Sequence, residues 1–238
     1  MNAPYGFELR ENCQTCTLQK TGFFCHVSDA ALSAFERTKF TSSYPAGAVL
    51  FVEGQSPRGV YMICKGRVKM MMSSADGKTM IVRFGEAGEM LGLHSSVSGE
   101  PYELTAETLE PCQINFVRRE DFLKLLHEHP EMYANAAQQL SGAYRIACQQ
   151  IRCLGLSHSA AEKLAGFLLE SAKKGQETKQ GVRFHLSLTH EEIAQIVGVS
   201  RETVTRGLSE LRSKMLISTS GPNVVIRNKP GLEAIVAA

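Results

Sequence analysis

The chain has 238 residues, 43% of them hydrophobic, and a formal net charge of +2. That length suits one large domain or two ordinary ones, and the apolar fraction is high enough for a buried core. No long uncharged apolar run is present, which excludes a membrane-spanning helix. The first ten residues lack the basic-then-apolar pattern of an export signal, so we expect a cytoplasmic protein that is not bound to a membrane.

Three cysteines gather in an N-terminal segment, residues 1–27: Cys13, Cys16 and Cys25. Without an export signal, the chain's seven cysteines favour metal or redox chemistry over disulfides. A two-residue spacing lets the first two thiolates face one metal centre. The alternative for Cys25 is a small buried side chain beside two phenylalanines. The candidates for a fourth ligand are His26, Cys64, Cys112, Cys148 and Cys153.

Residues 28–130 predict a β-rich sensor domain. A short helix over 28–38, capped by Ser28, precedes short extended runs separated by glycines. Asp76-Gly77 between two such runs is typical of a hairpin turn. Short strands with regular turns indicate an antiparallel barrel or jelly roll, followed by a helix over 121–129. The extended runs are 49–52, 59–63, 67–72, 79–84, 103–109 and 113–117.

A long helix is expected over 131–154, ended by Gly155. Its apolar residues recur every three and four positions, the heptad pattern of a helix that pairs with its own copy in a coiled coil. The alternative is that this seam packs on the barrel of the same chain. The seam residues are Tyr133, Ala137, Leu140, Tyr144, Ala147, Ile151 and Leu154.

Residues 155–238 predict a second domain. A helix is expected to begin within 157–162 and to end near Leu169, followed by a polar loop over 173–181 and a strand over 182–186. The stretch 186–216 predicts two helices joined by a tight turn at Gly198. A hairpin over 216–226 follows, which makes the arrangement a winged helix-turn-helix.

Each helix of this pair has a start signal and an apolar stripe. Thr189 and Glu192 form a capping box, and Ser200 caps the second helix. The second helix is expected to bury one stripe at helical spacing. The stripe residues are Val204, Leu208, Leu211 and Met215.

The opposite face of the second helix carries guanidinium donors, a carboxylate and hydroxyls, groups that contact base edges in a major groove. An ordinary helical hairpin with a solvated polar face is the alternative. Residues 155–238 hold 11 Lys and Arg against 8 Asp and Glu. The net charge of this part is therefore positive, as expected of a domain that binds a phosphate backbone. The candidate DNA-binding residues are Thr189, Ser200, Arg201, Glu202, Thr205, Arg206, Ser209 and Arg212.

From Cys13 to Ile226 the chain resembles the bacterial family of the cyclic-AMP receptor protein and the oxygen-sensing fumarate-and-nitrate-reduction regulator. The specific motifs are Pro45-x-Gly-x-x-Leu-Phe-x-Glu-Gly54, Gly66-Arg-Val-Lys69 and Glu202-Thr-Val-Thr-Arg206. The resemblance implies an α+β fold: a jelly roll, a dimerisation helix and a winged helix-turn-helix. It also implies a homodimeric transcription regulator, not an enzyme, that binds palindromic double-stranded DNA and RNA polymerase.

The nucleotide-binding branch of this family holds cyclic AMP with a glutamate and an Arg-Ser pair. Here Leu93 stands at the glutamate position, and Glu103 lies where the Arg-Ser pair would be. A phosphate needs a cation there, and a carboxylate would repel it. We therefore do not expect cyclic AMP to bind in the usual way.

The oxygen-sensing branch holds a [4Fe–4S] cluster with three N-terminal cysteines and one late in the barrel. Cys13, Cys16 and Cys25 resemble the first three and Cys112 the fourth, although eight residues separate the second from the third. A soft, thiol-rich set suits Fe–S or zinc. The alternatives are structural zinc, completed by His26 or Cys112, and another small molecule in the barrel. An enzyme or redox carrier is disfavoured because no acid–base or nucleophile constellation appears.

The resemblance also assigns base contacts. It implies that Arg206 binds a guanine and that Glu202 accepts from a cytosine amino group. Thr205 could touch a thymine methyl, and Arg201 resembles an arginine that contacts a second guanine.

Overall fold

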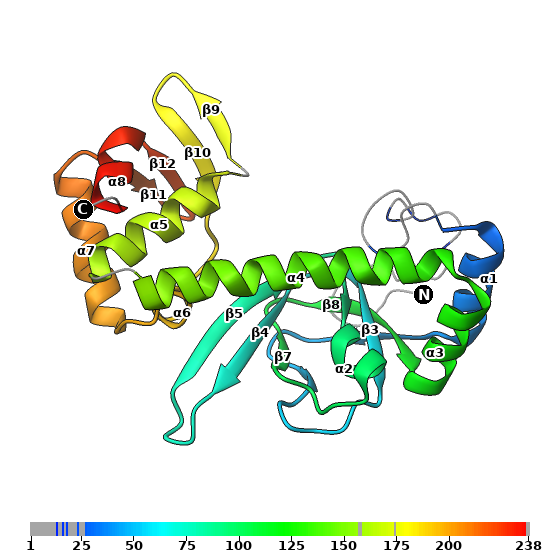
Figure 1. The fold of residues 1–238 in the computed structure, drawn as a ribbon. Helices are drawn as coiled ribbons and strands as arrows, with labels where there is room; N and C mark the ends of the chain where they lie inside the picture. Colours follow the sequence, from blue (N-terminus) through cyan, green and yellow to red (C-terminus); the bar gives the residue numbers. More distant parts are fainter. Residues whose placement is uncertain are drawn as a thin grey trace. The chain divides into compact units, whose positions relative to one another are not determined.

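The computed structural model describes residues 13, 16, 18, 23, 27–156, 159–173 and 175–236. The chain divides into two compact units, Met1–Ile146 and Ala147–Ala238, and one long helix, α4 (Glu131–Leu156), crosses the boundary (Figure 1). None of the described helices is long and apolar enough to cross a membrane.

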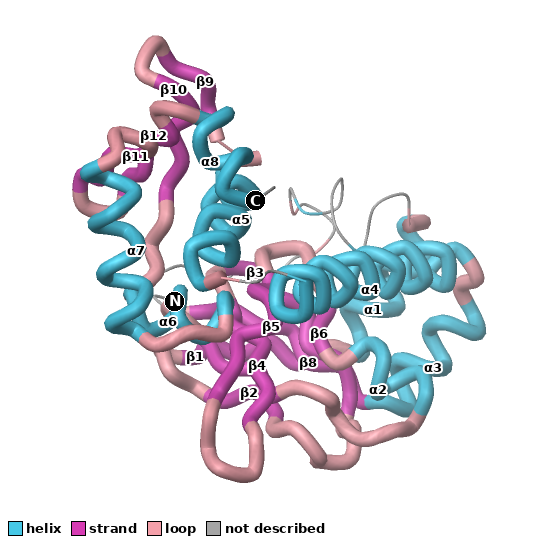
Figure 2. The backbone as a smooth tube through the Cα atoms, turned by 60° about the vertical axis from the view of Figure 1, so that its left-hand side comes forward, coloured by secondary structure: helices cyan, strands magenta, loops and turns pink. Residues whose placement is uncertain are grey.

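The first unit is an antiparallel β-roll of two four-stranded sheets, which confirms the predicted fold (Figures 1 and 2). One sheet has the order β1 (Phe40–Tyr44), β8 (Cys112–Arg118), β3 (Gly59–Lys65) and β6 (Met90–Leu91). The other has the order β2 (Val49–Phe51), β7 (Thr105–Thr108), β4 (Val68–Ser73) and β5 (Thr79–Gly85).

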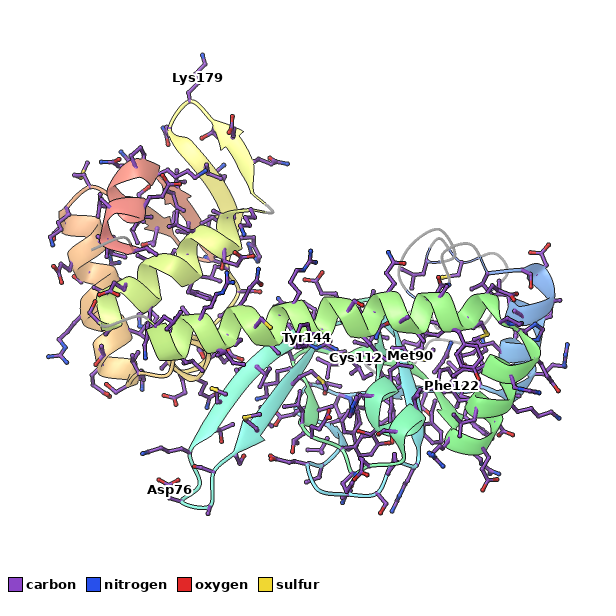
Figure 3. All side chains as sticks on the ribbon, in the orientation of Figure 1. Asp76, Met90, Cys112, Phe122, Tyr144 and Lys179 are labelled. Atoms are coloured by element: carbon purple, nitrogen blue, oxygen red, sulfur yellow. The ribbon has the colours of Figure 1, made fainter. Side chains whose placement is uncertain are left out.

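The predicted hairpin at Asp76-Gly77 joins β4 and β5, and Figure 3 labels Asp76 at its tip. Gly77 has a φ of 82°, a left-handed conformation that glycine adopts without a steric penalty. The backbone N–H of Ser74 donates to the carbonyl of Lys78 at 2.9 Å and closes the turn. Local turn chemistry therefore fixes the register next to the turn, where Ser73 lies opposite Thr79, and the register shifts farther along, between Met70 and Met71.

Three helices pack on the sheet that contains β3 and β8: α1 (Asp29–Thr38), α2 (Leu93–Ser98) and α3 (Arg119–Glu128). Ser28 caps α1 as expected, accepting from the N–H of Ala31 at 3.2 Å. Side chains alternate across β3, so Met62 and Cys64 lie in the core beneath the helices while Ile63 lies in the core between the sheets. The first unit therefore has two cores, one on each face of this sheet.

The N-terminal half of α4 buries Met132 and Ala136 in the core beneath the helices. The helix continues through Leu156, so the expectation that Gly155 ends it was wrong. A glycine costs a helix only about 1 kcal/mol relative to alanine, which neighbouring turns can offset.

The second unit packs four helices with a four-stranded sheet. The helices are α5 (Ala160–Ala172), α6 (His190–Val197), α7 (Arg201–Ser213) and α8 (Lys229–Val236). The sheet has the order β11 (Ile217–Ser220), β12 (Asn223–Ile226), β10 (Gly181–His185) and β9 (Gln176–Thr178). The expectation of a plain loop over 173–181 was therefore wrong, since β9 pairs with β10 there and Lys179 lies at the hairpin tip (Figure 3).

Met215 does not extend the buried stripe of α7, contrary to the sequence expectation. The helix ends at Ser213, and Met215 adopts a φ of 57° with 63% of its surface exposed. Leu216 turns inward in its place. Spacing alone predicted one further turn, but the chain leaves the helix to begin β11.

Candidate functional site

Both helices of the helix-turn-helix begin where the sequence predicts, and the first ends at the predicted Gly198. The Thr189 hydroxyl accepts from the N–H of Glu192 at 3.1 Å, and the Glu192 carboxylate accepts from the N–H of Thr189 at 2.8 Å, a complete capping box. Gly198 ends α6 with a φ of 69°, and Ser200 caps α7 by accepting from Thr203 at 3.2 Å. These caps set the direction in which α7 leaves the turn.

Helix α7 buries Val204, Leu208 and Leu211 and exposes the opposite face. The exposed residues there are Arg201, Glu202, Thr205, Arg206, Ser209 and Arg212. Hydrogen bonds from its own backbone N–H and from the Ser200 hydroxyl, with the charges of two arginines, hold the pKa of the Glu202 carboxyl below its usual value. This face therefore presents an ionised acceptor beside guanidinium donors, which suits base edges.

Thr205 and Arg212, on the exposed face of α7, also make contacts within the protein. The Thr205 hydroxyl donates to the carbonyl of Arg201 at 3.0 Å and lies 2.9 Å from Nδ1 of His190. The guanidinium of Arg212 lies 3.4 Å from the Thr219 hydroxyl of β11. Sequence reasoning missed His190, which joins the start of α6 to the exposed face of α7 and has no motif of its own.

The heptad seam of α4 lies largely outside the cores. Tyr133, Tyr144 and Ile151 are 50%, 74% and 69% exposed, and Ala137 is exposed as well. Leu140, Ala147 and Leu154 are intermediate, and Leu140 packs against the core of the first unit. The seam thus differs from the face that α4 buries, so most of its apolar surface is available to another molecule.

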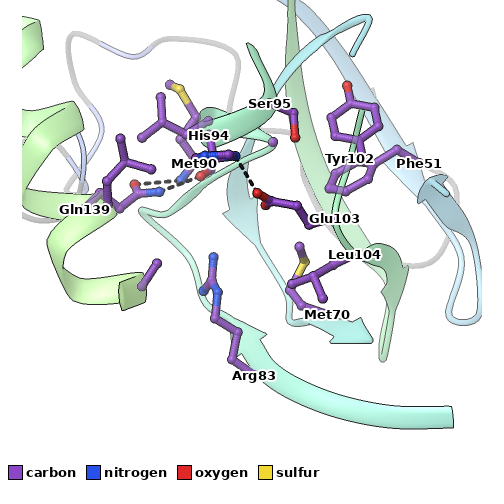
Figure 4. A pocket seen from close by; sticks show the side chains of 14 residues that line it. Phe51, Met70, Arg83, Met90, His94, Ser95, Tyr102, Glu103, Leu104 and Gln139 are labelled. Atoms are coloured by element: carbon purple, nitrogen blue, oxygen red, sulfur yellow. Dashed lines mark hydrogen bonds and ion pairs between the residues drawn. The ribbon is translucent and has the colours of Figure 1, made fainter. Parts of the chain in front are cut away.

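A pocket in the β-roll lies beside α4 and is lined by Gln139, Leu140 and Ala143 of that helix (Figure 4). The Gln139 side chain accepts from the N–H of Met90 at 3.0 Å and donates to its carbonyl at 2.5 Å. The pocket wall is therefore joined directly to the helix that carries the seam.

The charges of this pocket are paired within the chain. Glu103 lies 2.6 Å from Nδ1 of His94, and Arg83 lies 2.6 Å from Glu89, which does not line the pocket. Leu93 is buried in the pocket wall. Among the described lining residues, then, the Arg83 guanidinium and the His94 imidazole each already face a carboxylate, an arrangement that disfavours a phosphate anion.

Cys13 and Cys16 lie close together, with the N–H of Cys16 3.3 Å from the carbonyl of Cys13. The buried ammonium of Lys39 lies 3.2 Å from the Cys13 sulfur, and Glu36 accepts from the N–H of Cys13 at 3.0 Å. Cys25 and His26 lie outside the described residues. Among the residues that are described, no three His, Cys, Asp or Glu side chains are already arranged to hold a metal ion.

Cys112 is fully buried in the core between the two sheets. Its sulfur lies 3.4 Å from the carbonyl of Arg67 and 3.2 Å from that of Glu110. Cys148 and Cys153 are half-buried on α4. The structure thus brings Cys13 and Cys16 together and places Cys112 in a different core from the one that Cys13 contacts.

Phe23 connects the cysteine-bearing segment to the rest of the first unit. Its side chain is 1% exposed in the core beneath the helices. Its N–H donates to the carbonyl of Gly88 at 3.0 Å, and its carbonyl accepts from the Asn135 side chain of α4 at 2.7 Å. One residue of the segment therefore contacts both the β-roll and α4.

Comparison with known protein families matches both units. Residues 41–129 match the cyclic nucleotide-binding domain, and residues 162–235 match the Crp-like helix-turn-helix domain. The second match contains every candidate DNA-binding residue.

Individual proteins align over most of the chain. The cAMP-activated global transcriptional regulator CRP of Salmonella typhimurium is 26% identical over 84% of this chain and 95% of its own length. The CRP-like cAMP-activated regulator of Mycobacterium tuberculosis is 26% identical over 90% of this chain and 96% of its own. The structure of FixK2 from Bradyrhizobium japonicum aligns with a TM-score of 0.71 and 26% identity, over 84% of this chain and 98% of that one.

Proposed function

Because the chain is a DNA-binding transcription regulator of the CRP/FNR family, we propose that it acts as a homodimer whose two α7 helices bind the half-sites of a palindromic duplex. The observation that carries this proposal is the exposed heptad seam of α4. Tyr144 and Ile151 would bury their apolar surface against the same residues of a second copy. Two helix-turn-helix units held one helical turn apart bind far more tightly than one.

In this proposal α7 recognises sequence through Arg206 and Glu202. Arg206 would donate to a guanine, and the ionised Glu202 would accept from a cytosine amino group. Because the Thr205 hydroxyl already donates to the carbonyl of Arg201, its methyl group is the part left to contact a thymine. Arg201 would contact a second guanine or a phosphate.

We further propose that the N-terminal segment holds a thiolate-bound metal centre, a [4Fe–4S] cluster with zinc as the alternative. Cys13 and Cys16 fit such a centre because thiolates are soft donors. Burial raises the pKa of the Cys13 thiol, and the buried Lys39 ammonium beside it opposes that shift. Cys25 would add a third thiolate, and the β-roll would supply the fourth, Cys112 by sequence position. When bound, such a cluster supplies sensitivity to oxygen.

Phe23 connects this segment to α4, the helix that carries the dimer seam. While the segment is held, Phe23 fills the core and its carbonyl binds Asn135 on α4. Release of the segment would remove that ring and leave the Asn135 amide without this acceptor. We expect the N-terminal half of α4, and with it the pairing of the seam, to weaken as a result.

Three measurements on the full-length protein test the proposal. Iron and acid-labile sulfide are determined after oxygen-free purification, and zinc is determined in the same sample. Oligomeric state is measured before and after exposure to air. Affinity is measured for palindromic and half-site duplexes at one fixed salt concentration. A monomer that binds both duplexes equally would contradict the dimer, and absence of iron, sulfide and zinc would contradict the metal centre.

A further inference from the structure

We propose that Cys64 of β3, rather than Cys112 of β8, is the β-roll thiolate that joins Cys13 and Cys16 in binding the metal. This inference rests on the metal centre proposed above, and it changes which β-roll residue binds the metal. Cys64 and Cys112 offer the same thiolate donor, so only the position of each sulfur distinguishes the two candidates.

The surroundings of Cys13 identify the relevant face of the sheet. Its sulfur lies 3.8 Å from the Asn115 side-chain amide, and Asn115 pairs with Met62 across β8 and β3. Residues directly opposite each other in an antiparallel pair project to the same face. Cys64 follows Met62 by two residues and therefore shares that face. Consistently, Cys13 packs against the core cluster in which Cys64 is buried.

Cys64 also occupies an irregular position in its strand. Ile63 pairs with Ile114 and Lys65 pairs with Gln113, so β3 has one residue more than β8 across this step. Cys64 is that extra residue of a β-bulge. Bulges redirect a side chain and are found next to functional sites more often than elsewhere.

Cys112 lies on the other face of β8. It is three residues from Asn115, and its side chain belongs to the core between the sheets. A Cβ atom built at Gly66 would lie 2.5 Å from its sulfur, so the turn after β3 closes over this thiol. To reach Cys13 and Cys16, the Cys112 sulfur would have to cross the sheet.

The described residues hold no three ligands that are already arranged around a metal. Binding would therefore draw Cys13 and Cys16 towards β3.

The first test is a Co²⁺ titration of the reduced full-length protein, monitored by thiolate-to-metal charge-transfer absorbance. Wild type is compared with Cys64→Ser, Cys64→Ala, Cys112→Ser and the matched control Cys148→Ser. We expect both Cys64 variants to lose at least about tenfold in affinity, since loss of a direct ligand should exceed the loss of a supporting partner. Cys112→Ser and Cys148→Ser should bind as wild type does.

A second measurement does not require the variants to fold. Reduced, metal-free wild type is treated with a short bifunctional thiol reagent, and the linked peptides are identified by mass spectrometry. Links from Cys64 to Cys13 or Cys16 are expected. Links from Cys112 to either residue, or no link to Cys64, would overturn the proposal.

The outcomes separate this inference from the proposed function. If wild type binds Co²⁺ and Cys64→Ser binds equally well, or Cys112→Ser also loses affinity while folded, the choice of Cys64 is overturned and the metal centre stands. If wild type binds neither Co²⁺ nor iron with sulfide, the metal centre fails and this inference fails with it. Thermal unfolding of each metal-free variant shows which of them are folded.

Discussion

The carbonyl oxygen of Phe23 accepts a hydrogen bond from Nδ2 of Asn135 at 2.7 Å, which joins the cysteine-bearing segment to α4. The Phe23 ring lies in the core with its centroid 6.1 Å from that of Phe122. Along α4, Gln139 follows Asn135 by one turn and binds the backbone of Met90. The same helix therefore contacts both the segment and the pocket wall, through a face that lies opposite much of its exposed seam.

Phe23→Ala should lower the free energy of unfolding by about 3–5 kcal/mol, because it removes a fully buried ring and leaves a cavity. Phe40→Ala is the matched control, since that ring is 51% exposed and its removal should cost much less. Urea denaturation of both variants checks the difference. Equal losses would show that the segment does not pack in the core in solution.

The folded units could be predicted well from the sequence because their signals are local. The capping box at Thr189, the turn at Gly198 and the hairpin at Asp76-Gly77 each depend on a few adjacent residues. The exposed face of α7 follows from its periodicity alone. The end of α7 could not be predicted in this way, because the conformation of Met215 is set by the strand that follows.

The candidate metal site was less accessible to sequence reasoning. The spacing of Cys13 and Cys16 indicates that the two thiolates share a metal, and Cys112 follows only from the resemblance to the oxygen-sensing branch. Which face of the sheet a cysteine occupies depends on strand register, and a bulge at Cys64 alters that register. Neither feature has a signal in a single sequence.

Arg206→Ala should weaken binding to a specific palindromic site by about 1–3 kcal/mol and relax the preference at one base pair of each half-site. The reason is that a guanidinium makes paired hydrogen bonds to guanine that no other base reproduces. Affinities for duplexes substituted at each position, measured at constant salt, check this. Arg37→Ala on α1 removes the same charge from an exposed site outside the helix-turn-helix and is the control. Uniform weakening across all duplexes would show that Arg206 contacts only phosphate.

Tyr144→Glu should convert the dimer to a monomer, because it places two like charges across the seam where an apolar contact is expected. The side chain is 74% exposed, so the fold of one chain should be preserved. Gln149→Glu, on an exposed position outside the seam, is the control. Sedimentation measures the oligomeric state, and circular dichroism measures the fold. A Tyr144→Glu variant that remains dimeric would exclude this surface as the interface.

The buried hydroxyl of Tyr102 should make the folded protein less stable at alkaline pH. Its hydroxyl is buried, donates to the carbonyl of Gly59 at 2.9 Å and accepts from the N–H of Arg58 at 3.1 Å. Burial raises the pKa of Tyr102 above its usual value near 10. The folded protein therefore keeps this proton at a pH where the unfolded chain has lost it. The stability it contributes is present below about pH 10 and declines as the pH rises towards the folded pKa.

Tyr102→Phe separates this effect from the titration of other groups. At pH 8 the variant should be less stable by about 1–3 kcal/mol, because the carbonyl of Gly59 and the N–H groups of Arg58 and Gly59 lose a hydrogen-bond partner. Above pH 10 its free energy of unfolding should fall less steeply with pH than that of wild type. Urea denaturation between pH 8 and about pH 11 measures both quantities. Parallel pH profiles for the two proteins would show that the Tyr102 hydroxyl titrates alike in the folded and unfolded states, and that it is not enclosed in the β-roll.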